Sequence, residues 1–507
     1  MSFRKRLAAI LAVSIVAGLV WYAGINKLTI KEAEETPFFI HKDTLNLWYT
    51  DENLTDYLNS AAVAYNEKYD VRIVPHLTTG RDYLEELNTY SVETAEVPDL
   101  YIVSNDSLEK AWLAGLASEI QDERNVCTTE YFPQTALDAV TYKGKKVAYP
   151  FFYETSVLLY NKTYLEQFAE SEILAEIDAA EGEAAMQALE GVTEEELEEG
   201  NAGSIEGSGD SAYTEEELRA AVESRVNEML PDNMDELLTF ADSYDTPAEM
   251  ESIFKWDVTD IFYSYFFSGK YMIVGGEAGD LTDNIDIYNQ NTIDCLKVYQ
   301  NLNQFFAIDT KEVDYADILQ EFMEGKILYT IATSDAVATL EAAKEEGNFA
   351  YEYGVSLVPN PSAQLEGRSL SVTNAIVVNG YSSKKAQAND FAAFLLEEFS
   401  ENLYDRTGKL SASSKVVYEN ESLNGYMREY ERSIPIPKMI ETSNFWVQLE
   451  IAYTNIWDGN EVNATLKALS EQIKSQLSGE PVTEEYIEEE EVPAEEYWEE
   501  ETETVYG

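Results

Sequence analysis

The spacing of hydrophobic residues changes from segment to segment in the early part of the chain. Residues 44–49 (TLNLWY) and 71–74 are patterned as strands, whereas residues 54–69 carry apolar side chains at helical spacing. A helix around 83–94 and a buried strand at 98–104 follow. The order strand, helix, strand is typical of a βαβ unit, whose strands lie parallel in one sheet. The pattern therefore predicts an α/β fold.

The same spacings predict further elements downstream. Helices are expected at 234–244, 256–267, 293–306, 315–323, 384–399, 445–457 and 464–477. Strands are expected at 327–331, 353–359 and 373–378. No internal repeat of roughly 20–50 residues is visible, which argues against solenoids and propellers.

An uncharged, mostly apolar run covers residues 7–25 and follows three basic residues at 4–6. It is longer than the core of a cleaved signal, about 7–15 residues, and close to the roughly 17–25 residues that span a bilayer. No cysteine follows that could carry a lipid. We expect residues 1–27 to form an uncleaved transmembrane signal anchor and 28–43 a tether, with signal-peptide cleavage and secretion as the alternative. The basic flank places the body outside the cytoplasm.

The formal net charge of -62 excludes whole classes of function. Binding to nucleic acid needs clustered Lys and Arg, so no nucleic-acid partner is expected.

His41 and His76 are the only histidines, and Cys127 and Cys295 form no CxxC or CxxH spacing, so no metal site or cofactor is expected. We expect two buried thiols, with a long-range disulfide as the alternative outside the cell.

Two acidic segments interrupt the pattern of elements. Residues 163–218 contain no Lys or Arg, and no basic residue follows Lys474. Chains rich in Glu, Gly and Ser bury too little apolar surface to fold. We interpret 163–230 as an acidic, partly disordered insertion flanked by helices, and 479–507 as a disordered acidic tail.

Five blocks in chain order carry a family resemblance. They are TLNLWYTDENLTDYLNSAAVAYNEKYDVRIV, VPDLYIVSNDSLEKAWLAGLASEI, ALDAVTYKGKKVAYPFFYETSVLLYNKTYL, EFMEGKILYTIATSDA and IPIPKMIETSNFWVQLEIAYTNIWDG. Each resembles a motif of the maltose/maltodextrin type of bacterial extracellular solute-binding proteins, the substrate-binding components of ABC transporters. The resemblance covers most of residues 44–478 outside the insertion.

The resemblance implies a two-lobe, periplasmic-binding-protein-like α/β fold with the ligand in the cleft between the lobes. The implied crossings between lobes are 149–156, 355–361 and 408–414. The implied lobes are 44–150 with 362–410, and 151–361 with 411–478. Acting as a monomer, the protein would deliver a small solute, a sugar or oligosaccharide, to the permease subunits of an ABC importer by lobe closure.

The resemblance also places candidate solute contacts in the cleft. Glu154 matches a glycan-contacting carboxylate, Trp446 a stacking tryptophan and Asp106 an acidic cleft residue. The alternatives are a surface or hinge ion pair for Glu154, core packing for Trp446 and a helix cap for Asp106. Asp51 and Glu52 follow the first strand, and loops at the carboxyl ends of strands face the cleft; the alternative for both is a solvated turn.

Other positions depart from the family's pattern. Asp335 stands where the family carries a stacking tryptophan, and Trp256 and Asp257 replace a Tyr-Phe pair. Trp48 or Tyr49 could restore stacking from another direction, unless both belong to the core. The expected lining is more acidic and less aromatic than a maltodextrin site, so a cationic, non-sugar solute stays open as an alternative.

An enzyme is not expected. The chain contains no HExxH, G-x-S-x-G or P-loop motif. Paired carboxylates of a glycoside hydrolase remain an alternative in so acidic a chain. So does a surface sensor or structural protein that has lost transport.

Overall fold

The computed structural model describes residues 43–93, 97–190, 214–439 and 444–488. The chain divides into two units, Met1–Thr44 and Leu45–Gly507, and the fold below is that of the second. The predicted anchor and nearly all of the predicted tether lie outside the described residues. Within the described ranges, no helix has both the length and the apolar character needed to cross a membrane.

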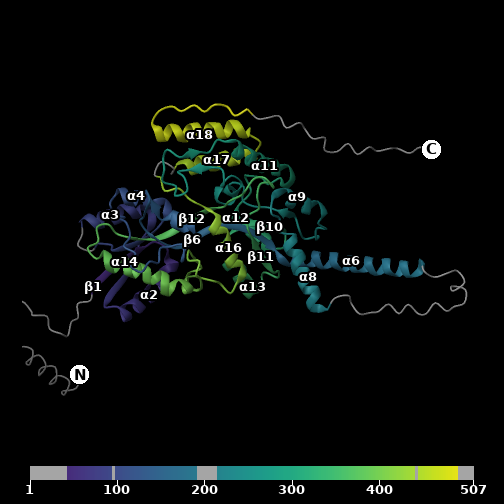
Figure 1. The fold of residues 1–507 in the computed structure, drawn as a ribbon, viewed down its shortest axis with the longest axis horizontal. Helices are drawn as coiled ribbons and strands as arrows, with labels where there is room; N and C mark the ends of the chain where they lie inside the picture. The colour runs from purple at the N-terminus through teal and green to yellow at the C-terminus, as the bar shows by residue number, and fades with distance from the viewer. Residues whose placement is uncertain (1–42, 94–96, 191–213, 440–443, 489–507) are drawn as a thin grey trace, which may run out of the picture. The chain divides into compact units, whose positions relative to one another are not determined.

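A ten-stranded sheet runs through the second unit in the order β2–β1–β3–β12–β6–β10–β7, with β11, β13 and β14 beside this path (Figure 1). The strands are β1 (Asp43–Tyr49), β2 (Val71–Leu77), β3 (Leu100–Ser104), β6 (Tyr149–Asn161), β7 (Ser252–Phe254), β10 (Ile327–Thr333), β11 (Tyr353–Ser356), β12 (Leu370–Val378), β13 (Leu410–Ser411) and β14 (Ile434–Pro435). The pairing of β1 with β3 is parallel, as the βαβ pattern predicts, but β12 pairs antiparallel with β3 and β6, so the sheet is mixed. The predicted α/β class is confirmed.

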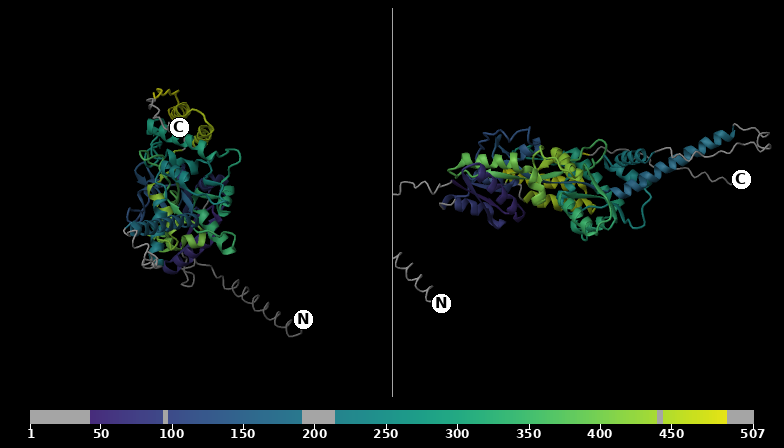
Figure 2. Two further views of the ribbon diagram at one scale, coloured as in Figure 1. Left: turned by 90° about the vertical axis from the view of Figure 1, so that its right-hand side faces the viewer. Right: turned by 90° about the horizontal axis from the view of Figure 1, so that it is seen from below.

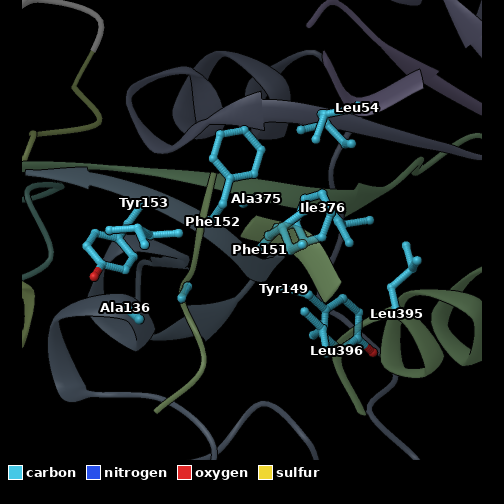
Figure 3. Close-up of a cluster of buried hydrophobic side chains, with 14 of the residues drawn as sticks. Leu54, Ala136, Tyr149, Phe151, Phe152, Tyr153, Ala375, Ile376, Leu395 and Leu396 are labelled. Atoms are coloured by element: carbon cyan, nitrogen blue, oxygen red, sulfur yellow. The ribbon is translucent and has the colours of Figure 1, made fainter. Parts of the chain in front are cut away.

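β6 belongs to both halves of this sheet. Its first part, through Thr155, pairs with β12 and β13, and its second part, from Ser156, pairs antiparallel with β10 and β11. All of its side chains are buried except that of Glu154, as expected for a strand covered on both faces. Figure 3 shows β6 side chains packed among those of β12. The three predicted crossings, 149–156, 355–361 and 408–414, all include residues of β6 or of a strand paired with it.

Helices cover the sheet. They are α2 (Thr55–Lys68), α3 (Tyr83–Glu93), α4 (Leu108–Leu113), α5 (Gln134–Ala139), α6 (Lys162–Glu190), α8 (Glu215–Glu228), α9 (Met234–Ser243), α10 (Ile261–Ser264), α11 (Gln290–Phe306), α12 (Tyr315–Met323), α13 (Asp335–Glu346), α14 (Lys385–Phe394), α15 (Leu403–Thr407), α16 (Glu421–Arg432), α17 (Phe445–Trp457) and α18 (Val462–Ser478). One predicted helix, 256–267, is wrong in its first part. There the Asp257 carboxylate accepts from the backbone N–H groups of Thr259 and Asp260, which forms a turn before α10.

The acidic insertion is helical where the structure describes it. α6 leads away from the sheet, and α8 returns beside its first turns (Figures 1 and 2). Arg225 of α8 forms ion pairs with Glu172 and Glu176 of α6. The middle of the insertion, residues 191–213, lies outside the described residues.

The first residues of the expected tail also contradict the prediction of disorder. Glu484 lies 2.6 Å from the Lys474 ammonium of α18. The Asn463 side chain donates to the Ile487 carbonyl (2.8 Å), and Ile487 packs on the adjacent core. Residues 479–488 therefore belong to the folded body, and residues 489–507 lie outside the described residues.

A buried carboxylate ties the connection between β11 and β12 to α16. Glu429 is 0% exposed and accepts from the backbone N–H of Val358 (3.1 Å) and from the N–H (3.3 Å) and hydroxyl (2.8 Å) of Ser369. Burial raises the pKa of Glu429, although Arg432 and the donors act to lower it. Val358 lies within the second predicted crossing, two residues after β11, and Ser369 directly precedes β12. Glu429 therefore fixes both ends of the connection between these strands.

Replacing Glu429 by Leu should lower the free energy of unfolding by about 3 kcal/mol, because buried N–H groups lose their acceptor. Urea unfolding would measure the loss. The matched control is Glu431→Leu at an exposed position of the same helix, expected to change stability by less than about 0.5 kcal/mol. Equal losses in the two variants would contradict the role given to Glu429.

A buried ammonium group joins elements of the two predicted lobes. Lys438 is 0% exposed and donates to the carbonyl oxygen of Asp138 in α5 (2.9 Å). It also donates to the carbonyl of Ala278, between β8 (Ile273–Val274) and β9 (Ile285–Asp286). Burial lowers the pKa of Lys438 to about 8, although the carboxylates of Asp280 and Asp138 act to raise it.

This shift predicts how stability depends on pH. The pKa of Lys438 is about 8 in the folded chain against an ordinary 10.5. Between these values the unfolded chain binds more protons, so the contribution of Lys438 to the free energy of unfolding rises with pH. Relative to Lys438→Met, the wild type should gain up to roughly 3 kcal/mol between about pH 7 and pH 10.

Denaturant unfolding of both proteins at the two pH values measures this gain. Lys415→Met removes an exposed lysine and corrects for the change in overall charge. The free energy of unfolding of Lys438→Met is subtracted from that of the wild type at each pH, and the same difference for Lys415→Met is used as the correction. If the corrected difference does not vary with pH, the predicted titration of Lys438 is wrong.

Candidate functional site

A solvent-open hollow of about 490 Å³ lies beside the carboxyl ends of β1 and β3 and against β6 and β12. Its lining residues are Thr50, Asp51, Leu54, Gly80, Asp82, Tyr83, Leu84, Glu85, Ile102, Val103, Ser104, Ser107, Lys110, Phe152, Glu154, Asn374 and Lys409. The carboxyl ends of the strands of an open α/β sheet are the usual place for a ligand.

The first wall of the hollow comes from the connections after β1, β2 and β3. After β1, the Asp51 carboxylate accepts from the Asn53 N–H (3.0 Å) and so caps the short turn Glu52–Leu54. After β3, Ser104 begins the turn that leads to Lys110. β1 and β3 thus each place a polar side chain, Asp51 and Ser104, in the hollow close to the end of the strand.

The floor comes from the crossing strands. Phe152 and Glu154 are two residues apart on β6, so both side chains leave the same face of that strand. Asn374 of β12 is the register partner of Phe152. Lys409 precedes β13, whose Leu410 pairs with the residue between Phe152 and Glu154.

The ammonium group of Lys409 links the wall to the floor. It lies 3.2 Å from an Asp51 carboxylate oxygen and 3.4 Å from one of Glu154. It also lies 5.7 Å from the centre of the Phe152 ring, within range of a cation–π interaction. Burial alone would lower the pKa of Lys409, but the carboxylates of Glu154 and Asp51 outweigh it and raise the pKa. Lys409 is therefore a charged group in this hollow.

The rest of the lining mixes polar residues with the apolar side chains of Leu54, Leu84, Ile102 and Val103. Its ionisable groups other than Tyr83 are Asp51, Asp82, Glu85, Glu154, Lys110 and Lys409. Its aromatic residues, Tyr83 and Phe152, are both buried. The hollow is thus lined by four carboxylates, two ammonium groups and two buried aromatic side chains.

Of the ten predicted solute contacts, the hollow brings together Asp51 and Glu154. Glu52 and Asp106 are exposed next to lining residues but do not line the hollow. The Asp106 carboxylate accepts from the hydroxyls of Ser104 and Ser107, both of which do line it. Asp106 therefore contacts two residues that line the hollow without lining it itself.

Three predicted contacts belong to the protein interior, which corrects their expected placement. Trp256 is 0% exposed, stacks on Phe254 and donates from Nε1 to the Ser264 hydroxyl (3.2 Å). Tyr49 is buried in the core of the first half of the sheet. Asp257 is buried and forms the turn before α10. In this conformation none of the three side chains is available to a solute in the hollow.

The remaining predicted contacts lie away from the hollow. Trp48 packs edge-on against Tyr90 of α3, with ring centres 4.9 Å apart. Asp335 is exposed at the start of α13, and Trp446 of α17 is half-buried with its ring edge-on to that of Tyr265. Asp335 and Trp446 belong to the second predicted lobe, and their roles remain predictions.

Sequence reasoning missed Lys409. Its position beside Gly408 in the third predicted crossing was the one indication in the sequence that Lys409 lies near the cleft. Nothing in the sequence indicated that it contacts Glu154, which is 255 residues away in the chain. Only the pairing of β13 with β6 brings the two together.

The cysteines and possible metal ligands add no second site. Cys127 and Cys295 are free, buried thiols, and burial raises the pKa of each to about 12. In the part of the chain that the structure describes, no group of three His, Cys, Asp or Glu residues is placed to hold a metal ion.

Comparison with known families gives one match to this chain. The sequence pattern of bacterial extracellular solute-binding proteins matches residues 60–426. The matched range begins within α2 and ends within α16, so it includes most of the hollow's lining and all of β6.

Solved structures share the fold. The extracellular solute-binding protein from Staphylococcus aureus in complex with maltose has a TM-score of 0.64 at 15% identity, covering 88% of this chain and 98% of that one. A cyclo/maltodextrin-binding protein complexed with maltotetraose has a TM-score of 0.64 at 17% identity, with the same coverage. A maltose-binding periplasmic protein from Listeria monocytogenes in complex with maltose has 0.62 at 18%, covering 87% and 100%. At these identities the likeness shows the fold alone.

Proposed function

Because this chain belongs to the bacterial extracellular solute-binding protein family, which is non-enzymatic, we propose that it captures a sugar or oligosaccharide in the hollow. Closure of the second lobe over the hollow would then present the loaded protein to the permease of an ABC importer. The predicted anchor at residues 1–27 would hold the protein at the outer face of the membrane.

The observation that carries this proposal is the chemistry of the hollow. A sugar presents many hydroxyl groups, each of which both donates and accepts a hydrogen bond. The lining offers acceptors on Asp51 and Glu154, donors on Lys110, and groups of both kinds on Ser104 and Asn374. Hydrogen bonds in which one partner is charged are stronger than bonds between two neutral groups. These charged and polar side chains can therefore bind the hydroxyl groups of a neutral, hydroxyl-rich solute.

The second half of the site is assigned to the other lobe. Every residue that lines the hollow lies in the first predicted lobe or on a crossing strand. A solute can favour the closed state only through contacts that it makes better there than in the open state. We assign Asp335 and Trp446 to those contacts, Trp446 by stacking and Asp335 by accepting hydrogen bonds.

A thermal-shift screen of mono- and oligosaccharides tests the proposal. A ligand that binds the native state at 100 times its Kd stabilises it by about 2.7 kcal/mol, so at least one sugar should raise the Tm. If only basic solutes raise the Tm, the ligand is cationic and the sugar proposal fails.

Glu154→Gln should then weaken binding of that sugar roughly tenfold, because a charged acceptor is replaced by a neutral one. Isothermal titration calorimetry would measure the Kd. Glu52→Gln removes the same charge from an exposed position outside the hollow and should leave the Kd nearly unchanged. Equal effects of the two substitutions would contradict the placement of the site.

A further inference from the structure

The Lys409 ammonium occupies a ready-made cation site. Two carboxylates approach it at 3.2 and 3.4 Å, and an aromatic ring lies 5.7 Å from it. Carboxylates around an aromatic face are the groups with which proteins bind ammonium ligands. Here the ammonium belongs to the protein itself, with 24% of its side chain exposed.

Backbone structure holds Lys409 in this position. α15 ends at Gly408 with a φ of 70°, a conformation that favours glycine. The Lys409 N–H donates to the Thr407 hydroxyl (3.1 Å), and the next residue, Leu410, pairs with Tyr153 of β6. The side chain therefore starts from a fixed point beside Glu154, unlike that of a lysine on a loose surface loop.

We propose that Lys409 is a specificity-determining residue: its ammonium fills the place between Asp51 and Glu154 where a cationic solute would bind, and so reserves the hollow for neutral, hydroxyl-bearing solutes. This inference rests on the proposed function, because it takes the hollow as the solute site. It names the property that the solute must lack, a positive charge.

The charge of the protein makes such a device necessary. A chain with a net charge of -62 attracts cations over its whole surface. Apart from Lys409, the lining holds four carboxylates against the single ammonium of Lys110. An unoccupied carboxylate pair in this field would concentrate polyamines and other cations at the site.

Lys409 competes with free amines for the same two carboxylates, and its covalent attachment to the protein gives it the advantage. A group attached to the protein competes at an effective concentration of about millimolar or higher. A free amine at micromolar concentration therefore loses to Lys409 for the same two carboxylates. A neutral solute does not have to displace Lys409, because it can bond the outer lone pairs of the carboxylates.

Calorimetric titration with putrescine and with 1,4-butanediol, its neutral counterpart, tests the inference at about 0.15 M salt. Lys409→Met should bind putrescine roughly tenfold or more tightly than the wild type does. Butanediol should show no such gain. Lys409→Gln repeats the test with a polar side chain in case the Met variant folds poorly, and the Tm of each variant checks its fold.

Lys110→Met is the matched control, because it removes the same charge from the same hollow without vacating the carboxylate pair. It should change the putrescine Kd by less than about threefold. Adding Asp51→Asn and Glu154→Gln to Lys409→Met should abolish the gain. Equal putrescine affinity in the wild type and in both Lys409 variants, or an equal gain in Lys110→Met, would overturn the inference.

These outcomes separate the inference from the proposed function. If the Lys409 variants gain putrescine binding while no sugar binds the wild type, the cation site is real and the sugar proposal fails. If a sugar binds the wild type but neither Lys409 variant gains putrescine binding, the function holds and the role of Lys409 is wrong.

Discussion

A single strand, β6, belongs to both halves of the sheet and fixes how they are joined. β6 pairs with β12 along its first part and with β10 and β11 along its second. Nearly every side chain on it is buried, so its direction is fixed by packing on both faces. The half-buried exception, Glu154, lies where the strand passes the hollow. The same strand thus connects the two halves and supplies the floor of the proposed site.

Charged side chains, two of them fully buried and one partly buried, lie where the two halves meet. Glu429 holds the second connection, Lys438 joins α5 to the loop between β8 and β9, and Lys409 lies at the third. A buried charge is costly unless it is paired or hydrogen-bonded. Each therefore specifies one arrangement of the segments that supply its partners, which a purely apolar contact would do less strictly.

The sequence predicts elements well where one face of the element is buried. β1, α2 and α17 follow from apolar spacing because each packs one side on a core. α16 is not among the predicted helices, although its buried residues have helical spacing, and its Gly425 is a poor helix former. The structure explains that glycine: a Cβ there would lie 2.2 Å from Val355 of β11. The segment 256–267 was predicted as one helix because its aromatic residues are dense, but they pack in the core around a turn.

Only part of the site could be predicted from the sequence, because pairing between strands that are far apart in the chain brings its residues together. Asp51 could be found from its place after a strand, and Glu154 from the family resemblance. Lys409 could not, because no local pattern connects it to residues 255 positions away. The central claim is that the two halves close over the hollow when a sugar binds. Pulsed electron spin resonance between labels at the exposed positions Leu113 and Val447 tests it most directly. Closure should shorten this distance when the sugar binds, and an unchanged distance at saturation would contradict closure.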